Sequence, residues 1–122
     1  MPKQTIAQGA NARFFHEVET RAAPERIWFL WTTPQTWRLW DQGLADAEFS
    51  GPFVVGATGR ITPKSGAKTR FRVTALQELR FYAFETSLPL ARLVVERSII
   101  SRDPTLIRHD VSFKGAFGAV WA

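Results

Sequence analysis

Near the end of the chain runs Thr105-Leu106-Ile107-Arg108-His109-Asp110-Val111-Ser112-Phe113-Lys114, in which apolar and polar residues alternate. The odd-numbered residues from Ile107 to Phe113 are apolar apart from His109, and the even-numbered residues from Arg108 to Lys114 are charged or polar. Successive side chains of a strand point to opposite faces, so this pattern predicts a strand with one buried and one solvated face. Such strands are typical of antiparallel sheets.

Five further strands are predicted before this one. They cover Asp46–Ser50, Gly56–Ile61, Thr69–Leu76, Arg80–Ser87 and Leu90–Ile100. Turn-forming pairs separate them, such as Gly51-Pro52, Leu88-Pro89 and Asp103-Pro104. Within the third of these strands, alternation places Phe71, Val73 and Ala75 on one face. Consecutive strands joined by short turns predict an antiparallel meander.

A strand and two short helices are predicted ahead of the meander. Residues 13–21 alternate, with Phe14, His16, Val18 and Thr20 on one face. Pro24 suits the first turn of a helix, and apolar residues follow at helical spacing up to Trp31. Thr33 is a candidate N-cap for a second short helix that holds Trp37 and Trp40. The predicted class is α+β, a curved antiparallel sheet of about seven strands with two short helices after strand one.

Length and composition indicate one domain without metal or cofactor. The chain has 122 residues, of which 45% are hydrophobic, and we expect a single domain over 13–122 behind a flexible N-terminal tail over 1–12. It contains no Cys and two His, too few ligands for a typical zinc site. No glycine-rich phosphate loop is present, so no cofactor is predicted. Neither a membrane span of roughly 20 apolar residues nor a signal core is found, so we expect a cytoplasmic location.

The positive charge of the chain has two interpretations. The formal net charge is +5, and several cations lie close together in the sequence: Arg60, Lys64, Lys68, Arg70, Arg72 and Arg80. A basic face can recruit phosphate-rich partners. Alternatively, Lys68, Arg70 and Arg72 alternate with Phe71 and Val73 and lie on the solvated face of one strand. No nucleic-acid-binding motif is present, so a nucleic-acid partner is not predicted.

The order and spacing of several short motifs resemble one superfamily. These motifs are Ala23-Pro24-Glu25-Arg26-Ile27-Trp28, Trp37-Arg38-Leu39-Trp40-Asp41, Phe49-Ser50-Gly51-Pro52-Phe53 with Gly56 and Gly59, and the final strand with Gly115. Together they resemble the START-like (SRPBCC, helix-grip) superfamily, in its bacterial polyketide cyclase/dehydrase-like branch. The resemblance implies a seven-stranded sheet wrapped around a long C-terminal helix, with an apolar cavity between them. The superfamily contains cyclases, dehydratases, lipid carriers and chaperone co-regulators, so the fold alone does not indicate which of these functions applies.

From the resemblance, we expect the long C-terminal helix to be truncated or missing in this sequence. Residues 115–122 are compatible with a helix start but would form only about two turns. We expect the natural protein to continue beyond Ala122 with an amphipathic helix of roughly 20 residues. If the chain ends at Ala122, we expect the open apolar face to be buried in a homodimer.

His109 and Arg97 are the candidate catalytic residues. His109 interrupts an apolar face, so it is predicted to point into the cavity as a general acid or base, or as a donor to a ligand. The structural alternative is a buried neutral histidine whose hydrogen bonds are made with a neighbouring group of the protein. Arg97 shares its parity with Leu93, Val95 and Ile99 and, if it faces inward, could bind an oxyanion. The alternative is that the twist of the strand lets the side chain of Arg97 reach solvent. Asp41 and Glu96 are the nearest candidate carboxylate partners.

A set of aromatic and aliphatic residues is predicted to line the cavity. The set comprises Trp37, Trp40, Phe71, Val73, Tyr82, Val95, Ile107, Val111 and Phe113. The two tryptophans lie three apart on one helical face, where they either close the core against the sheet or form a wall for a flat ligand.

The predicted function is binding of a small hydrophobic molecule, such as a polyketide, an aromatic compound or a lipid. Polyketide cyclase/dehydrase-type chemistry would have His109 shuttle a proton while Arg97 steadies an oxyanion. Two alternatives are a non-catalytic carrier of hydrophobic ligands and a protein-interaction module of the chaperone-regulator type. No stable membrane insertion is predicted.

Overall fold

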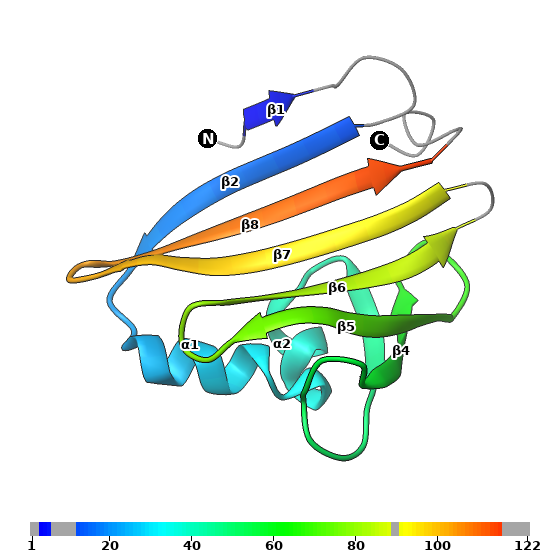
Figure 1. Ribbon diagram of the computed structural model, residues 1–122, viewed down its shortest axis with the longest axis horizontal. Coiled ribbons are helices and arrows are strands. Elements are labelled where there is room, and N and C mark those ends of the chain that lie inside the picture. The colour runs from blue at the N-terminus through cyan, green and yellow to red at the C-terminus, as the bar shows by residue number, and fades with distance from the viewer. Residues whose placement is uncertain (1–2, 6–11, 89–90, 116–122) are drawn as a thin grey trace.

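The computed structural model describes residues 3–5, 12–88 and 91–115 (Figure 1). The helical elements are α1 (Pro24–Trp31), a 3₁₀ turn (Pro34–Thr36) and α2 (Trp37–Trp40). The strands are β1 (Lys3–Thr5), β2 (Ala12–Thr20), β3 (Leu44–Glu48), β4 (Thr58–Pro63), β5 (Thr69–Gln77), β6 (Phe81–Leu88), β7 (Ala91–Arg102) and β8 (Thr105–Lys114).

All described strands form one antiparallel sheet in the order β1-β2-β8-β7-β6-β5-β4-β3. The six strands from β3 to β8 are a meander, and the last of them returns to pair with β2. This confirms the predicted α+β class, the antiparallel sheet and the position of the helices. The short strand β1 pairs with β2 through Lys3 and Phe15, within the segment that we expected to be a tail.

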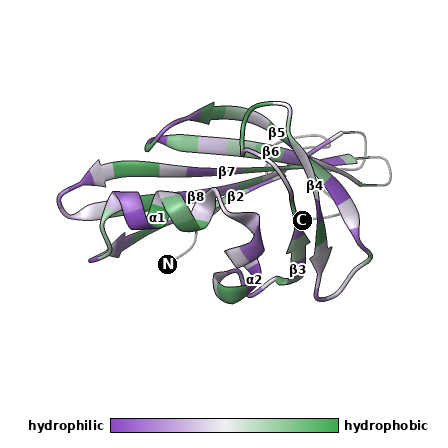
Figure 2. Cartoon of the chain, turned by 90° about the horizontal axis from the view of Figure 1, so that it is seen from below, coloured by the Kyte–Doolittle hydropathy of each residue, from purple (hydrophilic) through white to green (hydrophobic). Residues whose placement is uncertain are grey.

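The helices lie on one side of the curved sheet, which we call the concave face (Figure 2). Side chains of this face and of the helices form an aromatic core around Trp37, which is fully buried. Its ring lies 5.2 Å from that of Phe71 and 5.3 Å from that of Phe84, measured between centroids. Burial of aromatic rings of this size makes a large hydrophobic contribution, so the core ties the short helices to the sheet.

A β-bulge corrects one detail of the predicted alternation. The pairing of β5 with β6 shifts between Val73 and Ala75, so that Val73 pairs with Phe84 and Ala75 with Ala83. Paired residues share a face, and Phe84 and Ala83 are neighbours in one strand. Ala75 therefore lies on the face opposite Val73, because the extra residue of a bulge shifts the alternation by one.

Thr33 does not cap the second helix with its side chain. It occupies the position before the 3₁₀ turn, but its hydroxyl donates to the carbonyl oxygen of Phe29 at 2.6 Å. The preceding helix thus uses this hydroxyl to satisfy one of its terminal carbonyls.

Two further findings concern the ends of the domain and its helices. The expected start of the C-terminal helix covered residues 115–122, of which all but Gly115 lie outside the described residues. Among the described helices, none combines the length and the apolar character needed to span a membrane.

Candidate functional site

A row of four polar side chains crosses the concave face of the sheet. His16 of β2 pairs with His109 of β8, His109 pairs with Arg97 of β7, and Arg97 pairs with Tyr82 of β6. Directly paired residues on neighbouring strands share a face and lie within side-chain contact distance. The register of four strands therefore assembles this polar row within an otherwise apolar surface.

Arg97 is the centre of the row, and each of its three side-chain nitrogens donates a hydrogen bond. Its side chain is only 2% exposed. Nε donates to His109 Nδ1 at 3.3 Å, Nη1 donates to the hydroxyl of Tyr82, and Nη2 donates to Asp41 Oδ2 at 3.2 Å. A buried guanidinium needs a partner charge and satisfied donors, and these three acceptors supply both.

Aromatic rings complete the surroundings of Arg97. Its guanidinium carbon lies 4.8 Å from the ring centroid of Trp40 and 5.2 Å from that of Trp37. Cations are attracted to the faces of such rings, most strongly in desolvated sites. Because its side chain is almost fully buried among these contacts, the arginine is placed to hold its neighbours.

The contact with Arg97 determines which nitrogen of His109 carries the proton. In a neutral imidazole one nitrogen donates and the other accepts. Since Nδ1 accepts from Arg97, the proton of neutral His109 is on Nε2. Burial, followed by the charge of Arg97 and by His16, lowers the pKa of His109 to about 3. The imidazole is therefore a neutral hydrogen-bond donor at physiological pH.

The Nε2 atom of His109 is a candidate donor to a ligand. It has no hydrogen-bond partner within residues 3–5, 12–88 and 91–115, and His109 lines the cavity described below.

Tyr82 closes the inner end of the row. Its side chain is fully buried, and its ring stacks on that of Trp37 at 6.3 Å between centroids. Burial raises the pKa of Tyr82, although the neighbouring charge of Arg97 opposes this effect. Its phenol is therefore neutral, accepts from Arg97 and belongs to the support of the site.

A cavity of about 430 Å³ lies beside the row. Strands β2 and β8, the end of α1, and the segment from α2 to β3 contribute its walls. The lining residues are His16, Val18, Trp31, Trp40, Asp41, Gln42, Gly43, Ile107, Arg108 and His109. Apolar walls with a few convergent polar groups are the usual makeup of a small-molecule site.

The structure separates the predicted site residues into three groups. His109, Trp40 and Ile107 line the cavity. Five predicted residues belong to the buried core, namely Trp37, Phe71, Val73, Tyr82 and Val95. Val111 and Phe113 lie on the concave face further along β8, where Phe113 packs edge-on against Phe14 at 6.3 Å.

Several lining residues were not among the predicted ones. His16 could have been found, because alternation places it on the apolar face of the first long strand. Trp31 and Gln42 carry no local signal for a site, since only the packing of helices against the sheet brings them to β8. Asp41 is a partner of Arg97, whereas Glu96 pairs with Asp110 on the opposite face.

No metal centre is formed by the described part of the chain. Within residues 3–5, 12–88 and 91–115, no group of three His, Cys, Asp or Glu side chains is placed to hold an ion.

Comparison with known proteins shows the fold. No family model matches the chain, and no curated protein matches it. Solved structures do match. Norcoclaurine synthase from Thalictrum flavum, in complex with dopamine and hydroxybenzaldehyde, is 14% identical with a TM-score of 0.64, over 87% of this chain and 70% of that one. CalU16 from Micromonospora echinospora is 14% identical with a TM-score of 0.62, over 92% and 68% of the two chains.

A third similar structure is DR_A0006 from Deinococcus radiodurans, 14% identical with a TM-score of 0.66, over 86% of this chain and 84% of that one. These structures share the fold that the sequence motifs predicted. At this level of identity the similarity shows the helix-grip fold, and the function has to be inferred from the site itself.

Proposed function

We propose that this protein binds a small, flat hydrophobic molecule that presents an acceptor oxygen to His109 Nε2. The observation that carries the proposal is the hydrogen bond from Arg97 Nε to His109 Nδ1, because it directs the only imidazole proton away from the core. Trp31, Trp40 and Ile107 supply apolar walls in the same cavity.

The chemistry of the donor narrows the ligand class. A carbonyl, phenol or carboxylate oxygen can accept from a neutral imidazole N–H, whereas an ammonium group cannot. A neutral imidazole can also polarise a carbonyl without transferring a proton. The similar norcoclaurine synthase structure holds hydroxybenzaldehyde, an aromatic molecule with a carbonyl oxygen, which supports the same class here.

Acid–base catalysis by His109 finds less support than binding. A base with a pKa of about 3 takes up a proton from neutral solution poorly. The role of an oxyanion binder finds little support for Arg97, because its side chain is only 2% exposed and already contacts His109, Tyr82 and Asp41. It is a positioning residue, which sets the tautomer and orientation of the imidazole.

Binding of prodan, a dimethylaminonaphthalene with a propionyl carbonyl, tests the proposal. Its emission depends on whether the carbonyl accepts a hydrogen bond. We expect saturable binding, which weakens roughly tenfold in His109→Leu, the loss expected for one hydrogen bond. In His109→Gln, whose amide can donate from a similar position, affinity should stay within about threefold of the wild type. Gln77→Leu changes an exposed polar residue outside the cavity and should leave the affinity nearly unchanged.

A naphthalene without the carbonyl is the matched control ligand. Dimethylaminonaphthalene should bind the wild type and His109→Leu with equal affinity, because it offers no acceptor to Nε2. Equal prodan affinities for the wild type and a folded His109→Leu variant would contradict the proposal. Absence of saturable binding by either naphthalene would contradict the cavity as a ligand site.

A further inference from the structure

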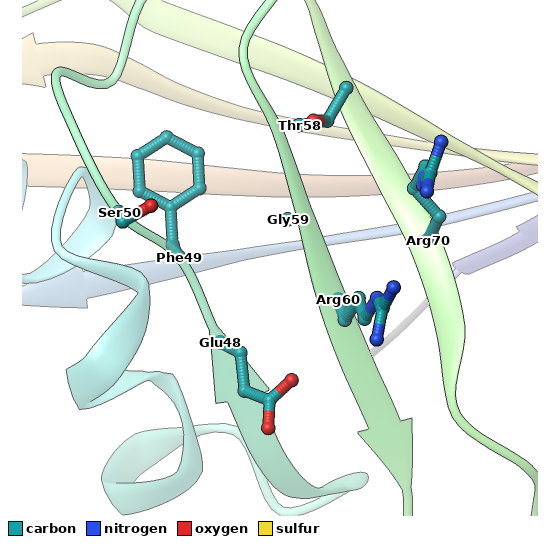
Figure 3. A pocket seen from close by; sticks show the side chains of 7 residues that line it. All are labelled: Glu48, Phe49, Ser50, Thr58, Gly59, Arg60 and Arg70. Atoms are coloured by element: carbon teal, nitrogen blue, oxygen red, sulfur yellow. The ribbon is translucent and has the colours of Figure 1, made fainter.

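A second depression lies beside β3, β4 and β5, and Figure 3 shows the side chains that line it. Its volume is about 440 Å³, and it forms where β3 ends while β4 continues. The lining residues are Glu48, Phe49, Ser50, Thr58, Gly59, Arg60 and Arg70. The interior neighbours of Arg60 and Arg70 are Ile61 and Phe71, which are 4% and 1% exposed, so both arginines face outward.

Arg60 and Arg70 oppose each other directly across the β4–β5 ladder. Figure 3 shows both side chains on the same side of the two neighbouring strands. Opposed residues of an antiparallel pair have Cβ atoms about 5 Å apart, and like charges in this position repel. The fold therefore keeps two guanidinium groups together where an intervening anion would remove the repulsion.

Three neighbouring cations have carboxylate partners, whereas this pair has none within the described residues. Lys68 Nζ lies 3.2 Å from Glu48 Oε1, and Arg72 and Arg92 lie 3.5 and 3.4 Å from Glu85. In the same described part of the chain no carboxylate lies within ion-pair distance of Arg60 or Arg70. The one carboxylate in the depression, that of Glu48, opposes Arg60 across the β3–β4 ladder, but the ion pair that it forms is with Lys68.

Two hydroxyl groups lie in the same depression. Ser50 and Thr58 are exposed, and their hydroxyls have no hydrogen-bond partner among the described residues. Arginine forks bind phosphate oxygens in pairs, and hydroxyls can donate to the remaining oxygens. The site thus holds donors of the kinds that a phosphate group requires.

The wall of the depression depends on a close approach at Gly59. A Cβ built on this residue would lie 2.6 Å from the carbonyl oxygen of Glu48 and 2.7 Å from the ring of Phe71. Only glycine lets the end of β3 come so near to β4. After this point Phe49 turns inward and packs on Phe71, with 6.0 Å between centroids, which leaves Ser50 at the rim.

We infer that the outer depression between Arg60 and Arg70 binds the phosphate group of a phosphate-bearing molecule. The inference is independent of the ligand proposed for the cavity, because the two sites share no lining residue.

Titration with phenyl phosphate, followed by NMR of the arginine Nε–H signals, tests the inference. The ionic strength is held constant with chloride, so that only specific binding moves the signals. We expect saturable shifts of the Arg60 and Arg70 signals. The dissociation constant should rise at least tenfold in Arg60→Gln and in Arg70→Gln, the loss of one charge-assisted hydrogen-bonded contact. Arg26→Gln, which removes an exposed arginine of α1, should change it less than about twofold.

Thermal unfolding gives a second readout. In phosphate-free buffer, Arg70→Gln should raise the unfolding midpoint, because it removes one of two repelling charges. Added phosphate should raise the midpoint of the wild type by more than that of the variant, because the stabilisation by a ligand depends on its affinity for the native state.

The source of the phosphate is distinguished by vesicles. Co-sedimentation with phosphatidic acid vesicles that is lost in Arg60→Gln would assign the site to a lipid headgroup. Phenyl phosphate binding without co-sedimentation would assign it to a soluble monoester. Shifts that do not saturate, or that Arg26→Gln weakens as much as Arg60→Gln does, would overturn the inference in favour of a merely solvated basic face.

Discussion

His109 shows how a single contact can change the chemistry of a side chain. Its partner Arg97 cannot lose its proton in a protein, so it always donates to Nδ1. The same positive charge adds to the effect of burial and disfavours a charged imidazole. A residue that the sequence suggests as an acid or base becomes a donor with a defined direction.

This environment predicts a pH dependence of stability that can be assigned to one residue. The unfolded chain takes up a proton on His109 below about pH 6.5, while the native state resists protonation down to about pH 3. The unfolded state therefore binds more protons in this window, and the free energy of unfolding should fall as the pH falls through it. The expected slope from this group is roughly 1.4 kcal/mol per pH unit.

Urea unfolding of the wild type and His109→Gln, measured from pH 7.5 to about pH 4, checks this prediction. The difference between the two free energies removes the contribution of the carboxylates, which both proteins share. We expect the wild type to lose its advantage progressively as the pH is lowered below 6.5. A difference that stays constant over this range would show that His109 takes up its proton equally in both states.

At the scale of elements, the edge of the sheet depends on how closely β3 and β4 approach. Gly59 pairs with Phe71 across β4 and β5, and it lies close to the backbone at the end of β3. The same contact supports both the aromatic core inside and the depression outside. A side chain at this position would have to displace backbone and a buried ring.

Gly59→Ala should therefore destabilise the protein by about 1–3 kcal/mol, the usual cost of overpacking. The matched control is Gly66→Ala, because a Cβ there would meet only Pro63 at 3.8 Å, an ordinary contact. The control should be neutral or slightly stabilising, since alanine restricts the unfolded chain. The unfolding midpoints of both variants, measured by thermal unfolding, test this prediction. Equal midpoints would contradict the close approach at Gly59.

At the scale of the whole molecule, one arginine joins elements that are far apart in the sequence. Arg97 of β7 contacts Tyr82 of β6, His109 of β8 and Asp41 at the end of α2. The same guanidinium lies over the ring of Trp40. The sheet, the helices and the wall of the cavity consequently depend on one buried group of contacts.

Tyr82 reports on the integrity of this assembly, because it is the only tyrosine of the chain. Its raised pKa means that the native protein keeps the phenol neutral above pH 10, where the unfolded chain ionises. The contribution of Tyr82 to stability is thus complete below pH 10 and is lost as the pH rises further. In an alkaline titration, tyrosinate absorbance should appear only together with the loss of the far-UV circular dichroism of the sheet.

Ionisation of the phenol near pH 10, with the circular dichroism unchanged, would contradict the buried position of Tyr82. Urea-unfolded protein is the reference in this experiment, and it should ionise near pH 10.

The sequence by itself determined the order of the elements and the faces of most strands. Alternation of apolar and polar residues is a local property, and it places Ile107 and His109 on one face whatever the neighbouring strands are. Proline and glycine mark turns for reasons that are equally local. The antiparallel meander and the two short helices could therefore be read from the chain, and the motifs led to the helix-grip fold.

Only the tertiary structure decided the register and the partners. His16, His109, Arg97 and Tyr82 form one row because four strands pair in one alignment, which no single segment encodes. The bulge beside Val73 reverses the face of Ala75, because one extra residue shifts the alternation. The contacts of Arg97 with His109, Tyr82 and Asp41 join residues over long sequence separations. The alternation along a strand indicates the face of the sheet on which a side chain lies, but only tertiary packing determines which group that side chain contacts.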